Sequence, residues 1–552
     1  MQKKQTILVV ASLLVVVLSV TLAYFTAQII GKGKNVTINS ADLKIIFTDS
    51  DGSISGTNIE PGKWNVTKTF TIENKSNETY KYNIVIQDLV NTFVTNGYLQ
   101  YKITSTNGGY NMTEFKDVPK SEIATDTILA YSASIDVGVT QSYTVEFIYK
   151  NDESVDQSND MGKTLSGKLF ITEGTLPTLL SQILKDNPTR DTRDTYDSVF
   201  TNNTTGTLFT ATEKNVHNIA DTTVYYYAGN TTNNWVKFGK YQKDLIIYRG
   251  YYNSPSTTDY NEYSTMDECT SASSYNKNCT EYKYANTGDD IYWRIIRTNA
   301  DGSIRLLYSG TSPDTTSGYI GKSAFNSSSN SPKYVGYMYG NDDSSLLNAR
   351  TNTNNSTIKT AIDNWYASNM TSYTKYLSTT AVYCNDRTEQ TSGTYNNGST
   401  TFYYAPYART NKNYTPTYDC TEASDAFSVD NTSAKLTYPI ALMTSDEIVF
   451  AGGTGKINLT SPTSSYAWYY YNSTNKSIAG TFCLLSPNNW DSSTARVFLV
   501  YGTFNPGGWH WVDTTTVSIV RPVLSLKSCI KYSTGNGAPE TPYEIVETDT
   551  GC

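Results

Sequence analysis

The chain of 552 residues is too long for one domain of ordinary size, so it predicts two or three globular units. Hydrophobic residues make up 38% of the chain, enough to build cores, whereas charged residues make up only 17%. A net charge of −8 without any basic stripe excludes a nucleic-acid-binding protein, because such proteins need a basic surface to displace phosphate counterions.

The N-terminal segment, residues 1–34, predicts export. Lys3 and Lys4 precede an apolar run from Ile7 to Phe25 that contains no charged residue. Its length lies between the ~7–15 apolar residues of a signal peptide and the ~20 residues of a spanning helix. Thr21-Leu22-Ala23 offers a small-residue cleavage site. We therefore expect either a cleaved signal peptide or a transmembrane helix at residues 7–25, which would anchor the protein in the plasma membrane, with the remainder secreted or at the cell surface.

The seven cysteines agree with export to an oxidising compartment, where disulfides persist. Proximity along the chain favours three disulfide bonds and leaves Cys483 unpaired, although sequence alone does not fix connectivity. The expected pairs are Cys269–Cys279, Cys384–Cys420 and Cys529–Cys552. The tight Cys and His spacing of a zinc site is not found. The acidic turns that begin at Asp49 and Asn341 could hold calcium, but a β-turn or plain solvation is favoured for them. Since no Gly-rich phosphate loop occurs either, neither a metal nor another cofactor is predicted.

Residues 35–174 predict one β domain. Tyr143, Val145, Phe147 and Tyr149 recur at every second position, as in a half-buried strand. Further strands are expected at Leu43–Phe47, Lys68–Ile72, Tyr80–Ile86 and Lys168–Thr172. Many short strands separated by polar turns indicate a β-sandwich or jelly roll.

Three motifs in the first part of the chain carry a family resemblance. "LAYFTA", "ADLKIIFTD" and "IEPGKWNVTKTFTIENKSNETYKYNIVIQDLVNTF" resemble the TasA/camelysin family of Gram-positive surface and matrix-fibre proteins. The resemblance covers residues 7–95 by motif and 96–174 by architecture. It implies a jelly-roll fold, export through a dedicated signal peptidase, and self-assembly into fibres by strand exchange.

The second part begins with a helix and a linker, residues 175–223, and continues as one domain over 224–552. Pro177 is expected at the first position of a helix that ends near Asn187. Asp301-Gly302 between two apolar runs predicts a hairpin, and residues 241–290 predict an insertion closed by a local disulfide. Two further helices are expected, over Ser356–Met370 with a cap at Ser356 or Thr357, and after the capping box that starts at Thr444.

A second resemblance rests on motifs in this half. "YWRIIRTNADGSIRLLY", "STIKTAIDNWY", "YPIALMTSDEIVFAGG" and "VRPVLSLKS" resemble surface domains of gut Firmicutes that have no established activity. Those domains are similar to the C-type lectin-like fold shared with formylglycine-generating enzymes. The resemblance spans Val224–Val546 and implies an α+β domain whose late loops face a ligand.

The sequence gives little support for catalysis. A nucleophilic enzyme needs a base, most often His, and the chain has two histidines. His217 lies in a polar loop without a nucleophile motif, and Cys483, the thiol that could partner His510, is expected in the core. We therefore predict that the protein is not an enzyme. A surface hydrolase that cleaves glycans through paired carboxylates is the alternative, because such pairs leave no sequence signature.

The candidate ligand-binding residues lie in the stretch from Trp490 to Trp511. Aromatic rings flanked by Asn, Ser and Gly are typical of loops that contact carbohydrates or proteins. The candidates are Trp490, Tyr501, Trp509, His510 and Trp511. As an alternative, Trp509 and Trp511 share one face of a strand and fill the core.

Together these patterns predict a mainly β protein, with a jelly-roll-like β-sandwich followed by an α+β C-type lectin-like domain. Its expected role is adhesion to a glycan or a surface protein of a host or bacterium, or a structural part in a surface fibre. The expected partners are that ligand, the membrane at the N-terminal segment, and further copies of the chain.

Overall fold

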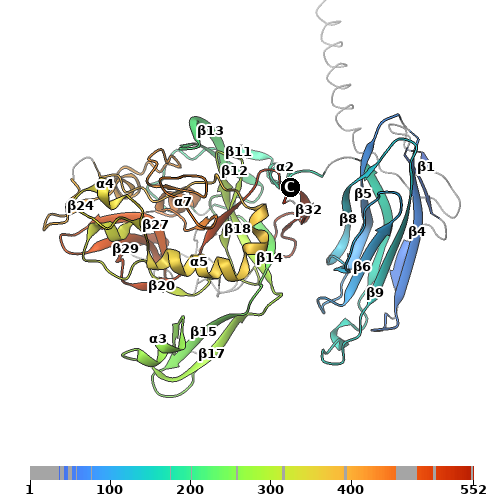
Figure 1. Ribbon diagram of the computed structural model, residues 1–552, viewed down its shortest axis with the longest axis horizontal. Helices are drawn as coiled ribbons and strands as arrows, with labels where there is room; N and C mark the ends of the chain where they lie inside the picture. The colour runs from blue at the N-terminus through green and yellow to red at the C-terminus, as the bar shows by residue number, and fades with distance from the viewer. Residues whose placement is uncertain are drawn as a thin grey trace, which may run out of the picture. The chain divides into compact units, whose positions relative to one another are not determined.

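The computed structural model describes residues 36–37, 43–47, 53–56, 59–75, 77–173, 176–200, 202–256, 259–313, 318–390, 394–454, 481–501, 505–548 and 551–552. The chain divides into two compact units, Met1–Leu176 and Pro177–Cys552 (Figure 1). With 41% strand against 14% helix, the predicted mainly β class is confirmed.

The first unit contains two antiparallel β-sheets. The six-stranded sheet has the order β1 (Val36–Thr37), β2 (Leu43–Phe47), β4 (Asn65–Asn74), β9 (Thr140–Tyr149), β6 (Leu99–Ser105), β7 (Lys116–Asp117). The four-stranded sheet has the order β3 (Ser53–Gly56), β10 (Leu165–Glu173), β5 (Tyr80–Asn91), β8 (Ser121–Ile135). A 3-10 turn, η1 (Ser158–Asp160), precedes β10.

Both sheets contribute to one core, so the first unit is a β-sandwich. On β9 the alternating residues Tyr143, Val145, Phe147 and Tyr149 are all buried. They pack with residues of the other sheet such as Leu169 on β10. The period-2 pattern therefore marks the buried face, and all the strands predicted in this unit are present.

The second unit begins with α2 (Leu179–Asp186), within the predicted helix. The Thr178 hydroxyl accepts a hydrogen bond from the Ser181 N–H at 3.1 Å and caps the helix. Pro177 consequently lies before the cap rather than at the first helical position. The segment expected as a linker, which ends at residue 223, contains β11 (Thr189–Asp191), β12 (Thr207–Asn215) and the first part of β13 (Asn218–Tyr226). Its polar composition reflects the exposed outer side of these strands, since only one side of β13 is buried, and only toward its C-terminal end.

These strands belong to a ten-stranded sheet with the order β11-β12-β13-β18-β14-β33-β32. Strand β19 pairs with β18 and β31, and β26 also pairs with β31. The bounds are β14 (Trp235–Lys240), β18 (Asp290–Thr298), β19 (Ile304–Tyr308), β26 (Ile440–Ala441), β31 (Val523–Leu526), β32 (Tyr532–Thr534) and β33 (Tyr543–Ile545). The predicted hairpin is confirmed, because Thr298 pairs with Ile304 and Gly302 adopts φ +76°.

A second sheet of six strands has the order β20-β30-β27-β28-β29, with β24 beside β27. Its strands are β20 (Lys322–Ala324), β24 (Phe402–Tyr403), β27 (Phe482–Trp490), β28 (Ala495–Tyr501), β29 (Asn505–Asp513) and β30 (Val517–Ile519). Two small pairs are β21 (Met338–Tyr339) with β22 (Asn354–Asn355), and β23 (Tyr383–Cys384) with β25 (Ala426–Phe427).

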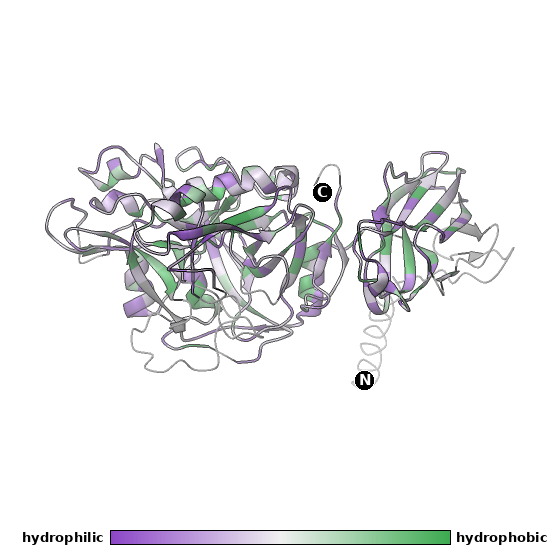
Figure 2. Ribbon diagram, turned by 90° about the horizontal axis from the view of Figure 1, so that it is seen from below, coloured by the Kyte–Doolittle hydropathy of each residue, from purple (hydrophilic) through white to green (hydrophobic). Residues whose placement is uncertain are grey.

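Helices accompany these sheets. The predicted helix α5 (Thr357–Asn369) is confirmed, with Ser356 as its cap, and so is α7 (Ser445–Ala451), with the capping box of Thr444 and Glu447. Shorter turns of helix are α4 (Leu346–Ala349), α6 (Ala405–Tyr407), η2 (Pro332–Val335), η3 (Thr371–Tyr376) and η4 (Ala408–Asn413). Hydrophobic residues concentrate on the inner strands of both units (Figure 2).

A separate three-stranded sheet projects from the second unit (Figure 1). We call it the arm, residues 245–285, and the remainder of this unit the body. The arm consists of β15 (Leu245–Tyr251), β16 (Asn261–Tyr263), α3 (Met266–Ser271) and β17 (Lys277–Ala285). It lies within residues 241–290, the range predicted as an insertion, and Cys269–Cys279 links α3 to β17.

The three predicted disulfides are all present, and Cys483 is a buried free thiol. Three disulfides fit an extracellular or cell-surface protein. The predicted signal peptide or anchor at residues 7–25 lies outside the described residues. Among the helices that are described, none has the length and apolar character required to span a bilayer.

A buried charge cluster joins the large sheet of the second unit to α7. The Glu447 carboxylate accepts hydrogen bonds from Arg297 Nε at 3.0 Å and Arg305 Nη1 at 2.6 Å. Glu213 on β12 pairs with Arg297 at 2.6 Å, and these side chains are at most 3% exposed. Burial by itself raises the pKa of the Glu447 carboxyl, but the Arg305 and Arg297 guanidinium groups outweigh it, so this pKa lies below its ordinary value.

Replacing Glu447→Gln is expected to lower the free energy of unfolding by about 3–5 kcal/mol, because Arg305 would be left buried without its counter-charge. In the unmodified chain this stabilisation is complete above the unfolded-state pKa of about 4.3 and is lost as the pH falls through the lower folded-state pKa. Urea unfolding at several pH values measures both effects. Asp221→Asn, whose side chain is 65% exposed, is the control and should change stability by less than about 0.5 kcal/mol.

Peptide mapping under non-reducing conditions should recover the three linked cysteine pairs. A thiol reagent should modify Cys483 only after denaturation, because burial shields its sulfur and raises the pKa of its thiol to about 11. Rapid labelling of Cys483 in the folded protein, or its recovery in a disulfide, would contradict this arrangement.

Candidate functional site

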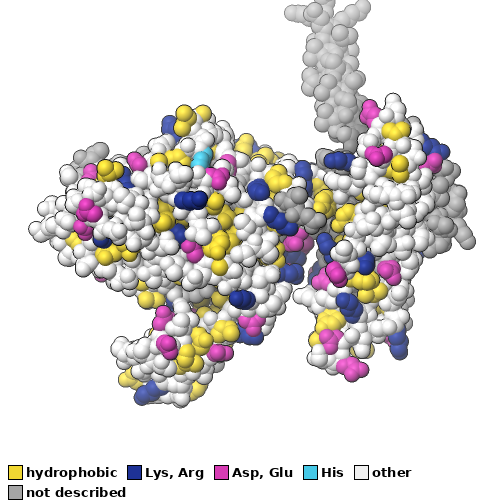
Figure 3. Space-filling model, in the orientation of Figure 1, with side chains coloured by type: hydrophobic (Ala, Val, Ile, Leu, Met, Phe, Trp, Pro, Cys, Tyr) yellow, Lys and Arg dark blue, Asp and Glu magenta, His cyan; other side chains and the backbone are white. Residues whose placement is uncertain are grey.

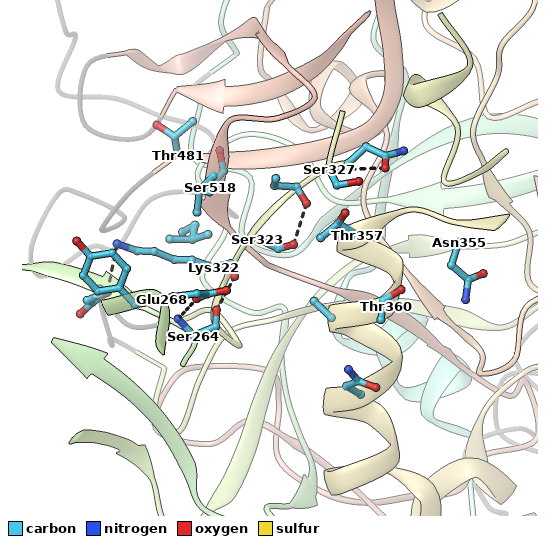
Figure 4. Close-up of a pocket in the computed structure, with 18 of the residues that line it drawn as sticks. Ser264, Glu268, Lys322, Ser323, Ser327, Asn355, Thr357, Thr360, Thr481 and Ser518 are labelled. Carbon is cyan, nitrogen blue, oxygen red and sulfur yellow. Dashed lines mark hydrogen bonds and ion pairs between the residues drawn. The ribbon is translucent and has the colours of Figure 1, made fainter. Parts of the chain in front are cut away.

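A cavity of about 1040 Å³ lies between the arm and the body of the second unit (Figure 4). Sites for small ligands commonly enclose ~300–1,000 Å³, so this cavity has the room for a ligand of several rings. The arm contributes β16 and the start of α3, and the body contributes β20, α5 and β30. The site therefore depends on elements far apart in the sequence.

Helix α5 forms one wall because it is two-sided. Thr357, Thr360, Ala361 and Asn364 follow the helical spacing of three and four residues and line the cavity. The opposite side of the helix is buried in the core through Ile358, Ile362, Trp365 and Tyr366. Figure 4 shows Thr357 and Thr360 on one side of the view and Lys322, Ser264 and Glu268 on the other.

Most of the residues that line the cavity are of neutral, polar type. More than half of the lining side chains are Asn, Ser or Thr, and Tyr263 and Tyr339 add two half-buried rings. Three lining residues are charged, namely Glu262, Glu268 and Lys322, and four are apolar, namely Ala324, Ala361, Val517 and Ile519. On the visible outer surface, charged side chains are likewise few and scattered (Figure 3).

Both cavity carboxylates accept hydrogen bonds from protein groups. Glu268 Oε2 accepts from the backbone N–H of Ser264 at 2.9 Å and of Thr265 at 3.3 Å, and thereby closes the capping box of α3. The Glu262 carboxylate is the acceptor for Arg249, at 3.1 Å from Nη2, and for the Tyr284 hydroxyl. Each of the two is thus committed to holding the arm in its conformation.

Glu262 also joins the arm to the body. Its Oε2 accepts from the hydroxyl of Tyr319, a body residue, at 2.8 Å. The Ser264 hydroxyl donates to the Lys322 carbonyl at 2.7 Å beside it. Within the arm, the Arg249 guanidinium lies 3.3 Å from the ring centroid of Tyr282, on which it stacks. These contacts fix the arm as one wall of the cavity.

Lys322 on β20 is the cation among the described residues that line the cavity. Its side chain is 28% exposed, and Nζ lies 3.7 Å from Glu262 Oε2. Burial lowers the pKa of Lys322, and the Glu262 carboxylate only partly offsets this. A further negative charge close to Lys322 would stabilise the charged form of its ammonium group.

The five ligand-binding residues predicted from the sequence lie on three neighbouring strands of one sheet, β27, β28 and β29. Trp490 is 2% exposed, and its indole N–H donates to the Gly398 carbonyl at 2.8 Å, so its ring is part of the core. Trp511 on β29 is 37% exposed, with the Arg496 guanidinium 3.9 Å from its ring centroid.

The other three candidates have described backbones alone. Trp509 and His510 lie in β29, and Tyr501 ends β28. Their side chains lie outside the described part of the structure. None of the five candidates is among the residues that line the described cavity.

The cavity itself was not predicted. The polar stripe on α5 and the insertion at 241–290 were signals for its two walls, but nothing in the sequence placed them opposite each other.

His217 has a partner that the sequence did not reveal, since its ring Nε2 lies 2.8 Å from Ser428 Oγ. Ser428 is fully buried, so this pair offers no nucleophile to a substrate. Among the described residues, no group of three or more His, Cys, Asp or Glu side chains could hold a metal ion.

No protein-family model matches the chain, and neither a curated protein nor a solved structure does so. The resemblances to the TasA/camelysin family and to lectin-like surface domains therefore stay predictions.

Replacing Glu262→Gln should loosen the arm, because Arg249 loses its counter-charge and the two tyrosine hydroxyls lose a charged acceptor. Hydrogen exchange measured by mass spectrometry should show amide exchange in residues 245–285 faster by about tenfold, a local loss of ~1.4 kcal/mol. Glu281→Gln, an exposed change on the same sheet, is the control. Equal protection of the arm in both variants would show that Glu262 does not hold it.

Proposed function

We propose that this chain is an exported cell-surface protein that binds a saccharide in the cavity between the arm and the body, without converting it. The observation that carries the proposal is the cavity's lining of Asn, Ser and Thr side chains around half-buried tyrosine rings. Hydroxyl and amide groups donate and accept hydrogen bonds, as sugar hydroxyls require. Tyrosine rings offer rigid apolar surfaces against which a sugar can pack.

The rest of the proposal concerns location. Three disulfides support an oxidising compartment outside the cytoplasm. The N-terminal segment would direct export and, if retained, anchor the chain in the membrane. The β-sandwich would then serve as a stalk that presents the second unit, or as an assembly domain of a surface fibre, as the TasA/camelysin resemblance implies.

The state of the two cavity carboxylates favours binding over hydrolysis. A glycoside hydrolase needs one carboxyl that donates a proton and a second carboxylate that attacks or activates water, roughly 5–10 Å apart. Glu268 accepts two backbone N–H groups, and Glu262 accepts from Arg249 and two tyrosine hydroxyls. Oxygens of both carboxylates are thus engaged by protein donors, whereas a hydrolase needs such oxygens for the substrate and for water.

A glycan array probed with the full chain tests this proposal. We expect retention of a subset of saccharides, and a loss of at least about tenfold in affinity for Ala361→Trp, because the indole would occupy space that the ligand needs. Ala367→Trp adds the same ring at an exposed position on α5 outside the cavity and should bind as the unmodified chain does.

Two results would contradict the proposed binding of a saccharide in the cavity. Retention of no saccharide, or equal binding by both tryptophan variants, would remove the cavity as a glycan site. Release of shortened products from a bound saccharide would replace binding by hydrolysis.

A further inference from the structure

We infer that the cavity selects saccharides that carry a carboxylate, and that Lys322 is the residue that binds this group. The inference rests on the proposed function, since it names the chemical class of the saccharide. It goes beyond that function because neutral polar side chains alone would not distinguish an acidic sugar from its uncharged counterpart.

The position of Lys322 is the first support. The residue lies on β20 and lines the cavity, and the Ser264 hydroxyl binds its carbonyl group, which holds its backbone beside the arm. The Lys322 ammonium has three N–H donors. Among the described residues its acidic partner is Glu262, and the distance from Lys322 Nζ to Glu262 Oε2 is 3.7 Å. That distance is longer than a charge-assisted hydrogen bond, which is ~2.7–2.9 Å.

The second support is that Glu262 is already shared. Its Oε1 lies 3.1 Å from Arg249 Nη2 and 3.2 Å from Arg249 Nε, and it also accepts from the Tyr284 hydroxyl. The Tyr319 hydroxyl occupies its other oxygen. Two cations, Arg249 and Lys322, therefore share one carboxylate, and the nearer cation is Arg249.

The electrostatics agree with this geometry. Burial lowers the pKa of Lys322, the Glu262 carboxylate raises it, and the Arg249 guanidinium lowers it again. Among the described residues, Lys322 therefore has one acidic partner, at 3.7 Å, and shares it with Arg249. Glu268, the other carboxylate of the lining, is held by the backbone N–H groups of Ser264 and Thr265. A ligand carboxylate would supply a second negative charge and accept hydrogen bonds from the Lys322 ammonium.

Matched pairs of ligands test the inference with the full chain. The probes are oligosaccharides that contain galacturonate, glucuronate or sialic acid, each compared with its methyl ester, which keeps the rings and linkages and removes the charge. Titration calorimetry at low salt should show the acid of at least one pair binding about tenfold or more tightly than its ester. Raising the salt concentration should reduce this preference.

Three variants assign the effect to Lys322. Lys322→Gln should bind acid and ester with equal affinity, whereas Lys322→Arg should retain part of the preference because it keeps the charge. Lys283→Gln removes an arm charge that pairs with Asp244 and should leave the preference unchanged. Unchanged thermal midpoints of all three would exclude unfolding as the cause.

The outcomes separate this inference from the proposed function. Binding of neutral saccharides without any preference for an acid, or a preference that survives in Lys322→Gln, would overturn the inference and leave the proposed function standing. Failure of every acid, ester and neutral saccharide to bind would overturn both.

Discussion

The candidate site depends on the buried carboxylate of Glu262. A buried charge is costly unless it is paired and hydrogen-bonded, so its partners are held tightly in place. Arg249 and Tyr284 bind it from the arm, and Tyr319 binds it from the body. Because Glu262 lies on β16, these bonds also fix the strand that forms one side of the cavity. Next to them, the Ser264 hydroxyl donates to the Lys322 carbonyl at 2.7 Å and joins the same two walls.

The arm needs such contacts because it is small. A three-stranded sheet with one short helix buries little apolar surface, and isolated small sheets are only marginally stable in water. Within the arm, Cys269–Cys279 joins the helix to the sheet, and the stack of Arg249 on Tyr282 adds packing that a core would otherwise provide. The polar and aromatic composition of this insertion thus has a structural reason besides any contact with a ligand.

Local features of the fold could be predicted from the sequence, and contacts between distant segments could not. The alternation around Val145, the Asp301-Gly302 turn and the helix cap at Ser356 each depend on neighbouring residues, and each is present. Strand β18 instead lies between β13 and β14, a pairing set by packing of the whole sheet. Exposure is equally non-local: Trp490 has the side chain of a ligand-binding residue, but its ring is more stable in the core.

The treatment of charge differs between the interior and the cavity. In the interior, Glu447 binds Arg305 at 2.6 Å, and Asp425 binds Arg387 at 2.6 Å, so an opposite charge at short distance neutralises each of these groups. Folding favours such pairs because an uncompensated buried charge is strongly destabilising. Lys322 departs from this arrangement at 3.7 Å from a carboxylate that other donors already occupy. A protein can tolerate such a cation where water or a ligand reaches it, and the cavity provides that access. Charge left under-compensated at a cavity wall is therefore available for binding a ligand rather than for stabilising the fold.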